Sequence, residues 1–191
     1  MKLVFATNNL NKLSEIRSLV PEGIQILSLS DINCNEELPE THPTLQENAL
    51  QKAKYVFDNY GFNCFADDTG LEINSLGGEP GVYSARYAGE YCSAEDNMRK
   101  VLEKLASEDD RRANFRTVIA LIVDGEETIF EGKCKGCMTT RKSGLEGFGY
   151  DPIFIPNGFD ITFAEMTKQQ KGAISHRGKA VKHLVSFLST N

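Results

Sequence analysis

Residues 2–20, KLVFATNNLNKLSEIRSLV, pass from a short apolar run into apolar residues at helical spacing. The run Lys2–Ala6 is rich in branched and aromatic side chains, which favours a β-strand, and the polar residues Thr7–Asn9 favour the start of a helix. The apolar side chains then recur at Leu10, Leu13, Ile16 and Val20. A proline and a glycine separate this segment from a second apolar run, residues 24–29. The stretch therefore predicts a strand, a helix and a second strand.

The next patterns continue an α/β arrangement. Residues 45–61 have the spacing of a second helix, and residues 62–66 resemble a buried strand. That strand is expected to deliver Asp67 and Asp68 to its C-terminal end, where open α/β sheets bind their ligands. Residues 75–89 are rich in glycine and predict a long, functional loop.

The second half of the chain has an antiparallel pattern. Alternating apolar residues on both sides of Asp124-Gly125 predict a hairpin, and Ser93 and Ser175 are each expected to cap a helix. We expect an α/β fold with a mixed, strongly twisted central sheet flanked by helices, with two lobes around an active-site cleft. Residues 1–191 are expected to form a single domain.

The composition disfavours several classes of protein. The formal net charge of −6 argues against a nucleic-acid groove, which relies on clustered lysine and arginine. No stretch approaches the roughly 18 uninterrupted apolar residues of a membrane span. The five scattered cysteines are typical of reduced thiols, so a cytoplasmic protein is expected. Cys134 and Cys137 form one C-x-x-C, which a strand end explains better than a zinc site that needs four ligands.

Two segments contain groups suited to a phosphorylated ligand and a metal. Thr7–Lys12 places backbone N–H groups and a lysine at a helix N-terminus, which suits an anion, although an ordinary helix cap is the favoured explanation of the segment taken alone. Asp67 and Asp68 would supply carboxylates, of which only one can face a site because neighbouring strand residues point in opposite directions. The alternative is a turn pair. Glu40 lies in an acidic segment that is either a solvated loop or a source of metal ligands, and Glu47 is another candidate.

The C-terminal half contains groups suited to a base. Phe148–Asp151 alternates aromatics with a glycine, a platform on which a purine can stack, although core packing is the competing explanation. Ser175-His176-Arg177 opens the last predicted helix, and Lys171 precedes it. This cationic stretch suits the recognition of phosphate or of a keto group.

Six motifs in order, spread from residue 3 to about residue 185, resemble the inosine triphosphate pyrophosphatase family, also called RdgB/HAM1-like non-canonical purine NTP pyrophosphatases. The motifs are Thr7–Lys12, Glu47–Ala49, Ala66–Gly70, Pro80–Tyr87, Gly147–Pro152 and Ser175–Gly178. The resemblance implies an Mg²⁺-dependent homodimer. It would convert ITP, dITP and XTP to the monophosphate and pyrophosphate.

The resemblance also implies roles for individual residues. Glu40 and Asp68 would bind the metal, and Asp68 would be the proton acceptor. The substrate would contact Thr7, Asn8, Asn9, Leu10, Asn11, Lys12, Thr69, Phe148, Gly149, Tyr150, Asp151, Lys171, His176 and Arg177. Thr69 replaces the family's usual serine and keeps the hydroxyl, whereas His42 stands near a position where glycine is common.

Three other functions remain open. A nucleotide-binding module without catalysis would need the same cations but no acidic metal ligands. A Maf-like pyrophosphatase would share the opening strand and helix, but the Ser175–Gly178 segment disfavours it. A general phosphatase would release orthophosphate instead of pyrophosphate.

Overall fold

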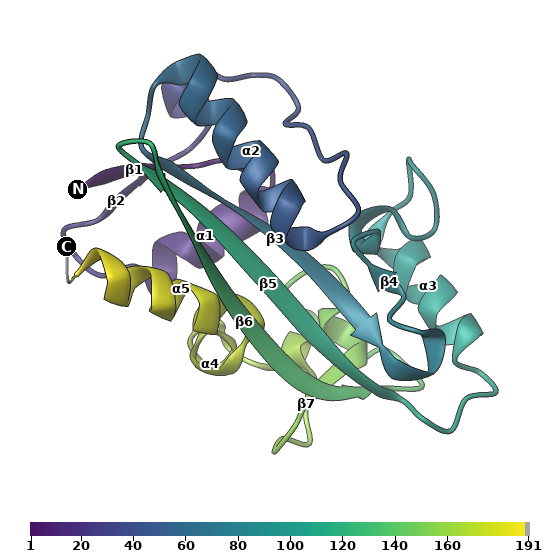
Figure 1. Ribbon diagram of the computed structural model, residues 1–191. Coiled ribbons are helices and arrows are strands. Elements are labelled where there is room, and N and C mark those ends of the chain that lie inside the picture. Colours follow the sequence, from purple (N-terminus) through teal and green to yellow (C-terminus); the bar gives the residue numbers. More distant parts are fainter. Residues whose placement is uncertain (190–191) are drawn as a thin grey trace. The chain divides into compact units, whose positions relative to one another are not determined.

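The computed structural model describes residues 1–189. Strand β1 (Lys2–Phe5) buries its apolar side chains and pairs in parallel with β2 (Gln25–Leu27). Helix α1 (Leu10–Leu19) connects them and turns Leu13 and Ile16 inward. The strand, helix and strand predicted from the opening stretch are therefore confirmed (Figure 1).

Helix α2 (Leu45–Tyr60) ends at Gly61, whose φ of 70° is a left-handed conformation that glycine adopts without strain. The chain then enters β3 (Cys64–Ile73), which pairs in parallel with β1 through Phe65. The observed strand is longer than expected. It continues past Asp67 and Asp68, so the two carboxylates lie inside the strand and the expectation that they stand at its C-terminal end was wrong.

Beyond these carboxylates β3 has a different partner. Leu71 lies opposite Gly81 of the short antiparallel strand β4 (Pro80–Gly81). A Cβ atom on Gly70 would come within 2.6 Å of the Gly81 carbonyl oxygen, so glycine is needed for this close approach. The loop predicted at residues 75–89 therefore supplies a short strand that pairs with the end of β3.

The hairpin is confirmed. Strands β5 (Arg112–Val123) and β6 (Glu126–Met138) are joined by Asp124 and Gly125, both with positive φ, and β6 pairs with β7 (Phe154–Pro156). The seven-stranded sheet has the order β2-β1-β3-β5-β6-β7, with β4 beside β3. Parallel and antiparallel pairs occur together, so the expected mixed α/β class is confirmed.

Helix α3 (Ala94–Lys104) begins at Ser93, whose hydroxyl and the Asp96 carboxylate form the predicted capping box. Near the C-terminus, α4 (Lys168–Ile174) precedes α5 (His176–Leu188), and Ser175 lies between them as the C-cap of α4. The sequence patterns did not predict α4. Five short 3₁₀ segments complete the described chain: Ser30–Ile32, Asn74–Leu76, Ser84–Arg86, Asp151–Ile153 and Phe163–Glu165.

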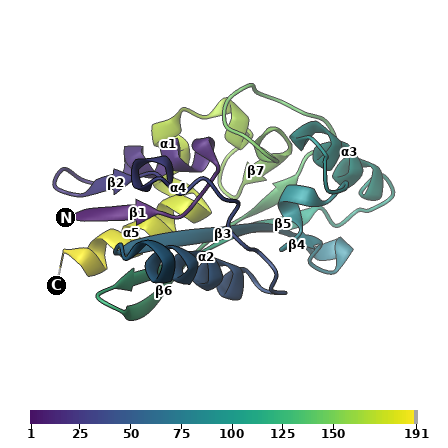
Figure 2. The same ribbon diagram turned by 90° about the horizontal axis from the view of Figure 1, so that it is seen from above.

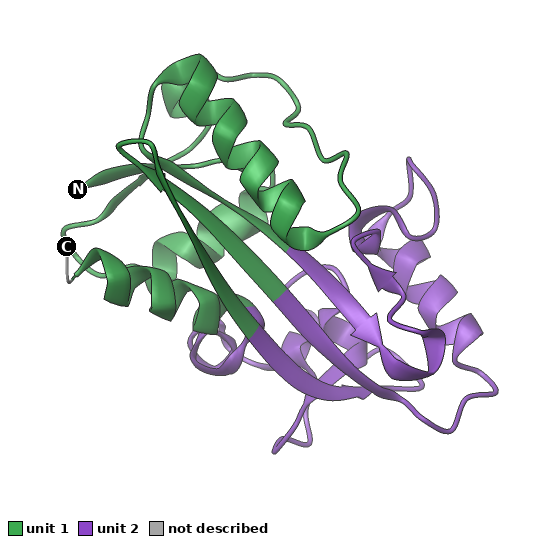
Figure 3. Ribbon diagram, in the orientation of Figure 1, with its two compact units in different colours: residues 1–68, 117–132, 177–191 green, residues 69–116, 133–176 purple. Residues whose placement is uncertain are grey.

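The chain divides into two compact units (Figure 3). Unit 1 comprises residues 1–68, 117–132 and 177–191, and unit 2 comprises residues 69–116 and 133–176. Strands β3, β5 and β6 contribute residues to both units. The single domain and the active-site cleft stay predictions.

Each unit has its own apolar core. In unit 1, α1 and α5 pack on the face of the sheet that carries Phe5 and Phe65, and α2 covers the opposite face (Figure 2). In unit 2 the core gathers around Phe115, Phe154 and Phe163. None of the helices in residues 1–189 combines the length and apolar character that a membrane span requires.

Candidate functional site

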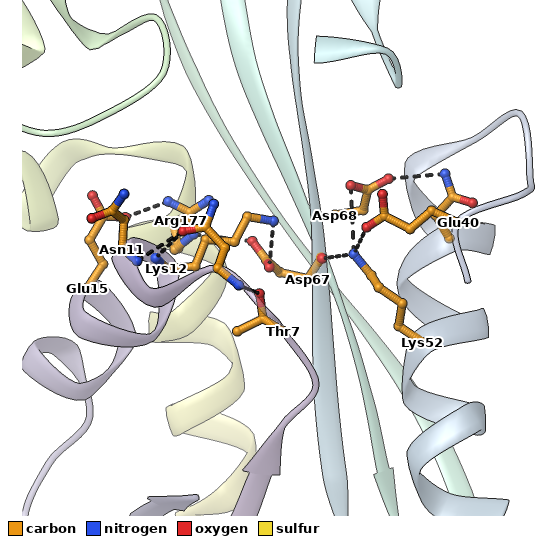
Figure 4. A network of polar contacts seen from close by, with 11 residues as sticks. Thr7, Asn11, Lys12, Glu15, Glu40, Lys52, Asp67, Asp68 and Arg177 are labelled. Atoms are coloured by element: carbon orange, nitrogen blue, oxygen red, sulfur yellow. Dashed lines mark hydrogen bonds and ion pairs between the residues drawn. The ribbon is translucent and has the colours of Figure 1, made fainter. Parts of the chain in front are cut away.

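Asp67 and Asp68 point to opposite sides of β3, as the alternation of a strand requires (Figure 4). Each carboxylate meets its own set of cations, and both sets belong to unit 1. The alternative explanation of the pair as a turn is excluded because both residues lie within β3.

The Asp67 network consists of Asp67, Lys12, Arg177 and Glu15. Lys12 Nζ donates to Asp67 Oδ1 at 2.9 Å, and Arg177 Nε donates to Oδ2 at 3.2 Å. Arg177 also donates to the carboxylate of Glu15. Burial alone would raise the pKa of Asp67, but the charges of Lys12 and Arg177 outweigh it and hold the pKa below its ordinary value. Asp67 therefore binds two cations as a carboxylate, the half-buried Lys12 and the buried Arg177.

The turn Thr7–Lys12 is organised as a helix cap. Asn9 Oδ1 accepts from the backbone N–H groups of Asn11 and Lys12, at 3.0 and 3.2 Å, and Thr7 Oγ1 accepts from that of Asn9. Asn8 Nδ2 reaches the backbone carbonyl of Glu36 at 3.2 Å. The cap interpretation is therefore confirmed for this segment. Its contacts with phosphate, including those of the exposed Leu10 and Asn11, stay predictions.

On the other side of β3, Asp68 lies with Glu40 and Lys52. Lys52 Nζ donates to Glu40 Oε1 and lies 4.0 Å from Asp68 Oδ1. Asn48 Nδ2 donates to Asp68 Oδ2 at 3.3 Å. Burial raises the pKa of Asp68 despite its cationic neighbour. Burial would lower the pKa of Lys52, but the carboxylates of Asp68 and Glu40 outweigh it and raise that pKa.

Lys52 is a central residue of this site that the motif analysis missed. Its ammonium also donates to the backbone carbonyl of Asp67 at 2.7 Å, so it contacts both residues of the pair. The available signal was its helical spacing from Asn48, four residues earlier. Glu47, the alternative metal ligand, accepts from the Thr44 hydroxyl at the start of α2.

Glu40 and Asp68 fit a magnesium ion chemically. Their carboxylate oxygens gather around one cationic group, the ammonium of Lys52, and hard oxygen ligands are those that Mg²⁺ prefers. Within residues 1–189, no group of three or more histidine, cysteine and acidic side chains is placed to hold a metal. Mg²⁺ in nucleotide sites commonly takes one or two carboxylates together with substrate phosphates, which is the number that this pair supplies.

In unit 2, Asp151 organises the predicted base-binding residues. Its Oδ2 accepts from Lys171 Nζ at 2.7 Å and from the backbone N–H of Phe148 at 2.9 Å. Lys171 Nζ also lies 4.9 Å from the centroid of the Phe148 ring. Phe148 and Gly149 are half-buried, which leaves part of the platform accessible. The structure therefore brings these residues together through one carboxylate.

Two other predicted contacts are core residues of unit 2. Tyr150 is buried, and its hydroxyl donates to the backbone carbonyl of Ser84 at 2.7 Å. His176 is also buried and stacks on Phe115 with ring centroids 4.6 Å apart. The core-packing explanation therefore holds for Tyr150. Thr69 is half-buried, and the contacts of all three with substrate stay predictions.

The boundary of the units falls inside two of the motifs. Asp68 belongs to unit 1 and Thr69 to unit 2, and His176 belongs to unit 2 and Arg177 to unit 1. In each of these motifs, two residues that are adjacent in the sequence therefore belong to different units. The C-x-x-C is not a pair on one face, because Cys134 is buried and Cys137 is exposed.

A substitution at Gly147 would test the arrangement of side chains around Asp151. Its φ is 74°, and an added Cβ would overlap the Asp151 carboxylate. Gly147→Ala should therefore lower the thermal midpoint more than Gly158→Ala, whose φ of 88° carries the same backbone strain but whose Cβ would meet nothing within 4 Å. Scanning calorimetry of both variants measures this difference. Equal midpoints would show that Asp151 does not need its observed place.

Known proteins with similar sequences and structures indicate the family. A model described as the Ham1 family matches residues 3–187. The dITP/XTP pyrophosphatase of Christiangramia forsetii is 58% identical, over 99% of this chain and 100% of the relative. That of Flavobacterium johnsoniae is 57% identical, over 99% and 98%. The solved Ham1 protein of Staphylococcus aureus has a TM-score of 0.89 at 40% identity, over 100% of this chain and 99% of the other. The HAM1 protein of Coxiella burnetii has a TM-score of 0.91 at 37% identity, with both chains fully covered.

Proposed function

The chain belongs to the Ham1 family, and on that premise we propose that it is a nucleoside-triphosphate pyrophosphatase for non-canonical purine nucleotides. It would convert ITP, dITP and XTP to the monophosphate and pyrophosphate. The observation that carries the proposal is the arrangement of charges on the two sides of β3. Glu40 and Asp68 contact Lys52 on one side, and Asp67 contacts Lys12 on the other. Carboxylates for a metal and ammonium groups for phosphates are what this hydrolysis requires.

Glu40 and Asp68 are the residues proposed to hold Mg²⁺. The ion, when bound, would draw charge from the phosphate oxygens. Lys52 contacts both carboxylates, so a bound cation would replace part of the contact between its ammonium and these carboxylates. Its raised pKa keeps it protonated, so it remains available as a donor to phosphate.

The remaining residues would position the substrate and the water. Water would attack the α phosphorus as the bond to the β-phosphate oxygen breaks, and pyrophosphate would leave. Asp68 would orient this water, since a carboxylate that binds Mg²⁺ is a poor proton acceptor at neutral pH. Lys12 would share the negative charge of the leaving group.

Base selection is assigned to unit 2. The Phe148 ring would stack on the purine, and Lys171, held by Asp151, would donate to the 6-keto group of hypoxanthine or xanthine. The amino group of adenine would reverse that donor pattern. A site whose buried polar group loses its partner discriminates strongly against the wrong base.

A product assay tests the function. The purified protein is incubated with Mg²⁺ and each of ITP, XTP, GTP and ATP, and nucleoside monophosphate, pyrophosphate and orthophosphate are quantified. Monophosphate and pyrophosphate from ITP and XTP, with little from GTP or ATP, are expected. Orthophosphate would indicate a general phosphatase, and binding without turnover would indicate a nucleotide-binding module.

The protein is also proposed to act in the cytoplasm as a homodimer. All five cysteines are thiols, which suits a reducing compartment. The dimer rests on the family resemblance. Light scattering after size-exclusion chromatography would test it, and a mass of one chain would contradict it.

A further inference from the structure

Three residues on one face of α2 form hydrogen bonds with consecutive residues of the loop that carries Glu40. Lys52 donates to the Glu40 carboxylate. Gln51 accepts from the backbone N–H of Thr41 at 3.0 Å and donates to its hydroxyl at 2.9 Å. Asn48 Oδ1 accepts from the backbone N–H of His42 at 2.8 Å. Residues 48, 51 and 52 share one helical face, so a single turn of α2 fixes this loop.

Asn48 differs from the other two because its amide also reaches β3. Its Nδ2 donates to Asp68 Oδ2 at 3.3 Å, and the residue is 1% exposed. One buried amide therefore joins the loop that carries Glu40 to the strand that carries Asp68.

We propose that Asn48 is a positioning residue that fixes the distance between the Glu40 loop and the Asp68 carboxylate. This rests on the proposed function, in which those carboxylates hold the metal. The amide suits both contacts, because its nitrogen donates to a carboxylate and its oxygen accepts from a backbone N–H. Groups that orient metal ligands commonly contribute about 10–100-fold to metal affinity or activity.

Substituting Asn48 with Asp or with Ala distinguishes its contact with His42 from its contact with Asp68. Asn48→Asp keeps an acceptor for the His42 N–H but cannot donate to Asp68. Asn48→Ala loses both contacts. Asn59→Asp is the matched control, since it makes the same change on an exposed side chain of α2 whose amide donates to the Tyr55 carbonyl.

The experiment combines kinetics with two measurements that need no turnover. With ITP and Mg²⁺, both Asn48 variants should lower kcat by about 10–100-fold with a smaller change in KM, and Asn59→Asp should match the wild type. Without nucleotide, Mn²⁺ binding followed by electron paramagnetic resonance should weaken in Asn48→Ala. Hydrogen exchange of the His42 amide should accelerate in Asn48→Ala but stay slow in Asn48→Asp.

The outcomes are distinguishable. Wild-type Mn²⁺ affinity in Asn48→Ala, or equal His42 exchange in both Asn48 variants, would overturn the positioning role even if the enzyme is active. A wild-type protein that does not hydrolyse ITP would refute the proposed function, whatever the exchange data show. If Asn48→Ala does not fold, Asn48→Asp still decides, because retained kcat in that variant contradicts the proposal.

Discussion

Replacing Asp67 with alanine is expected to lower the free energy of unfolding by about 3–5 kcal/mol, the usual cost of leaving buried charges without their partner. Asp67 is fully buried and binds Lys12 and Arg177 through separate oxygens. Arg177 keeps Glu15 in the variant, but Lys12 loses the carboxylate that offsets its burial. Urea unfolding followed by circular dichroism measures the change.

The matched control is Asp110→Ala. Asp110 also pairs with an arginine, Arg112, at 2.8 Å, but this pair is solvated and its loss should change the unfolding midpoint far less. If the two variants are equally stable, the Asp67 network does not stabilise unit 1. An intermediate result for Asp67→Asn is expected, because the amide keeps the shape and an acceptor but loses the charge.

The local elements of this fold were predictable because their signals lie within a few residues. The opening strand and helix, the capping box at Ser93 and the hairpin at Asp124-Gly125 each follow from spacing and turn chemistry. The helix α4 was missed because its seven residues, KQQKGAI, have no apolar periodicity. Its capping box at Thr167 was the only local sign.

The length of β3 could not be predicted locally. Its second half is held by β4, a two-residue strand that local patterns do not distinguish from a loop. Two adjacent aspartates also disfavour a buried strand unless cations neutralise them. Those cations, Lys12 and Arg177, lie 55 and 110 residues from Asp67 in the sequence.

The sequence predicted which residues form the candidate site better than it predicted their contacts with one another. The family resemblance implied Glu40 and Asp68 as metal ligands, and in the structure both carboxylates contact the ammonium of Lys52. The resemblance also implies that Arg177 contacts the substrate, and this stays a prediction; in unit 1 its side chain donates to Asp67 and Glu15. Which partner a buried cation takes depends on the tertiary fold, so spacing along the chain cannot reveal it.

Asp68→Asn should lower kcat for ITP by about 10²–10⁴-fold, the contribution expected of a side chain that handles the attacking water. The amide keeps the shape of the carboxylate and can still accept from Asn48, so the fold should be retained. Nucleotide binding should remain measurable, because Lys12, Phe148 and Lys171 are unchanged. Quench-flow kinetics and calorimetric titration with ITP in Ca²⁺ measure the two quantities.

A magnesium titration separates the two roles of Asp68. If the carboxylate only binds the metal, a higher Mg²⁺ concentration compensates for the weaker site and turnover recovers. If it also orients the water, saturating Mg²⁺ leaves kcat low, which is the result we expect. Asp124→Asn, the same change at an exposed turn, is the control and should behave as the wild type. Full activity of Asp68→Asn at ordinary Mg²⁺ would show that Asp68 is not part of the catalytic site, and the role would then be sought at another residue of β3 or α2.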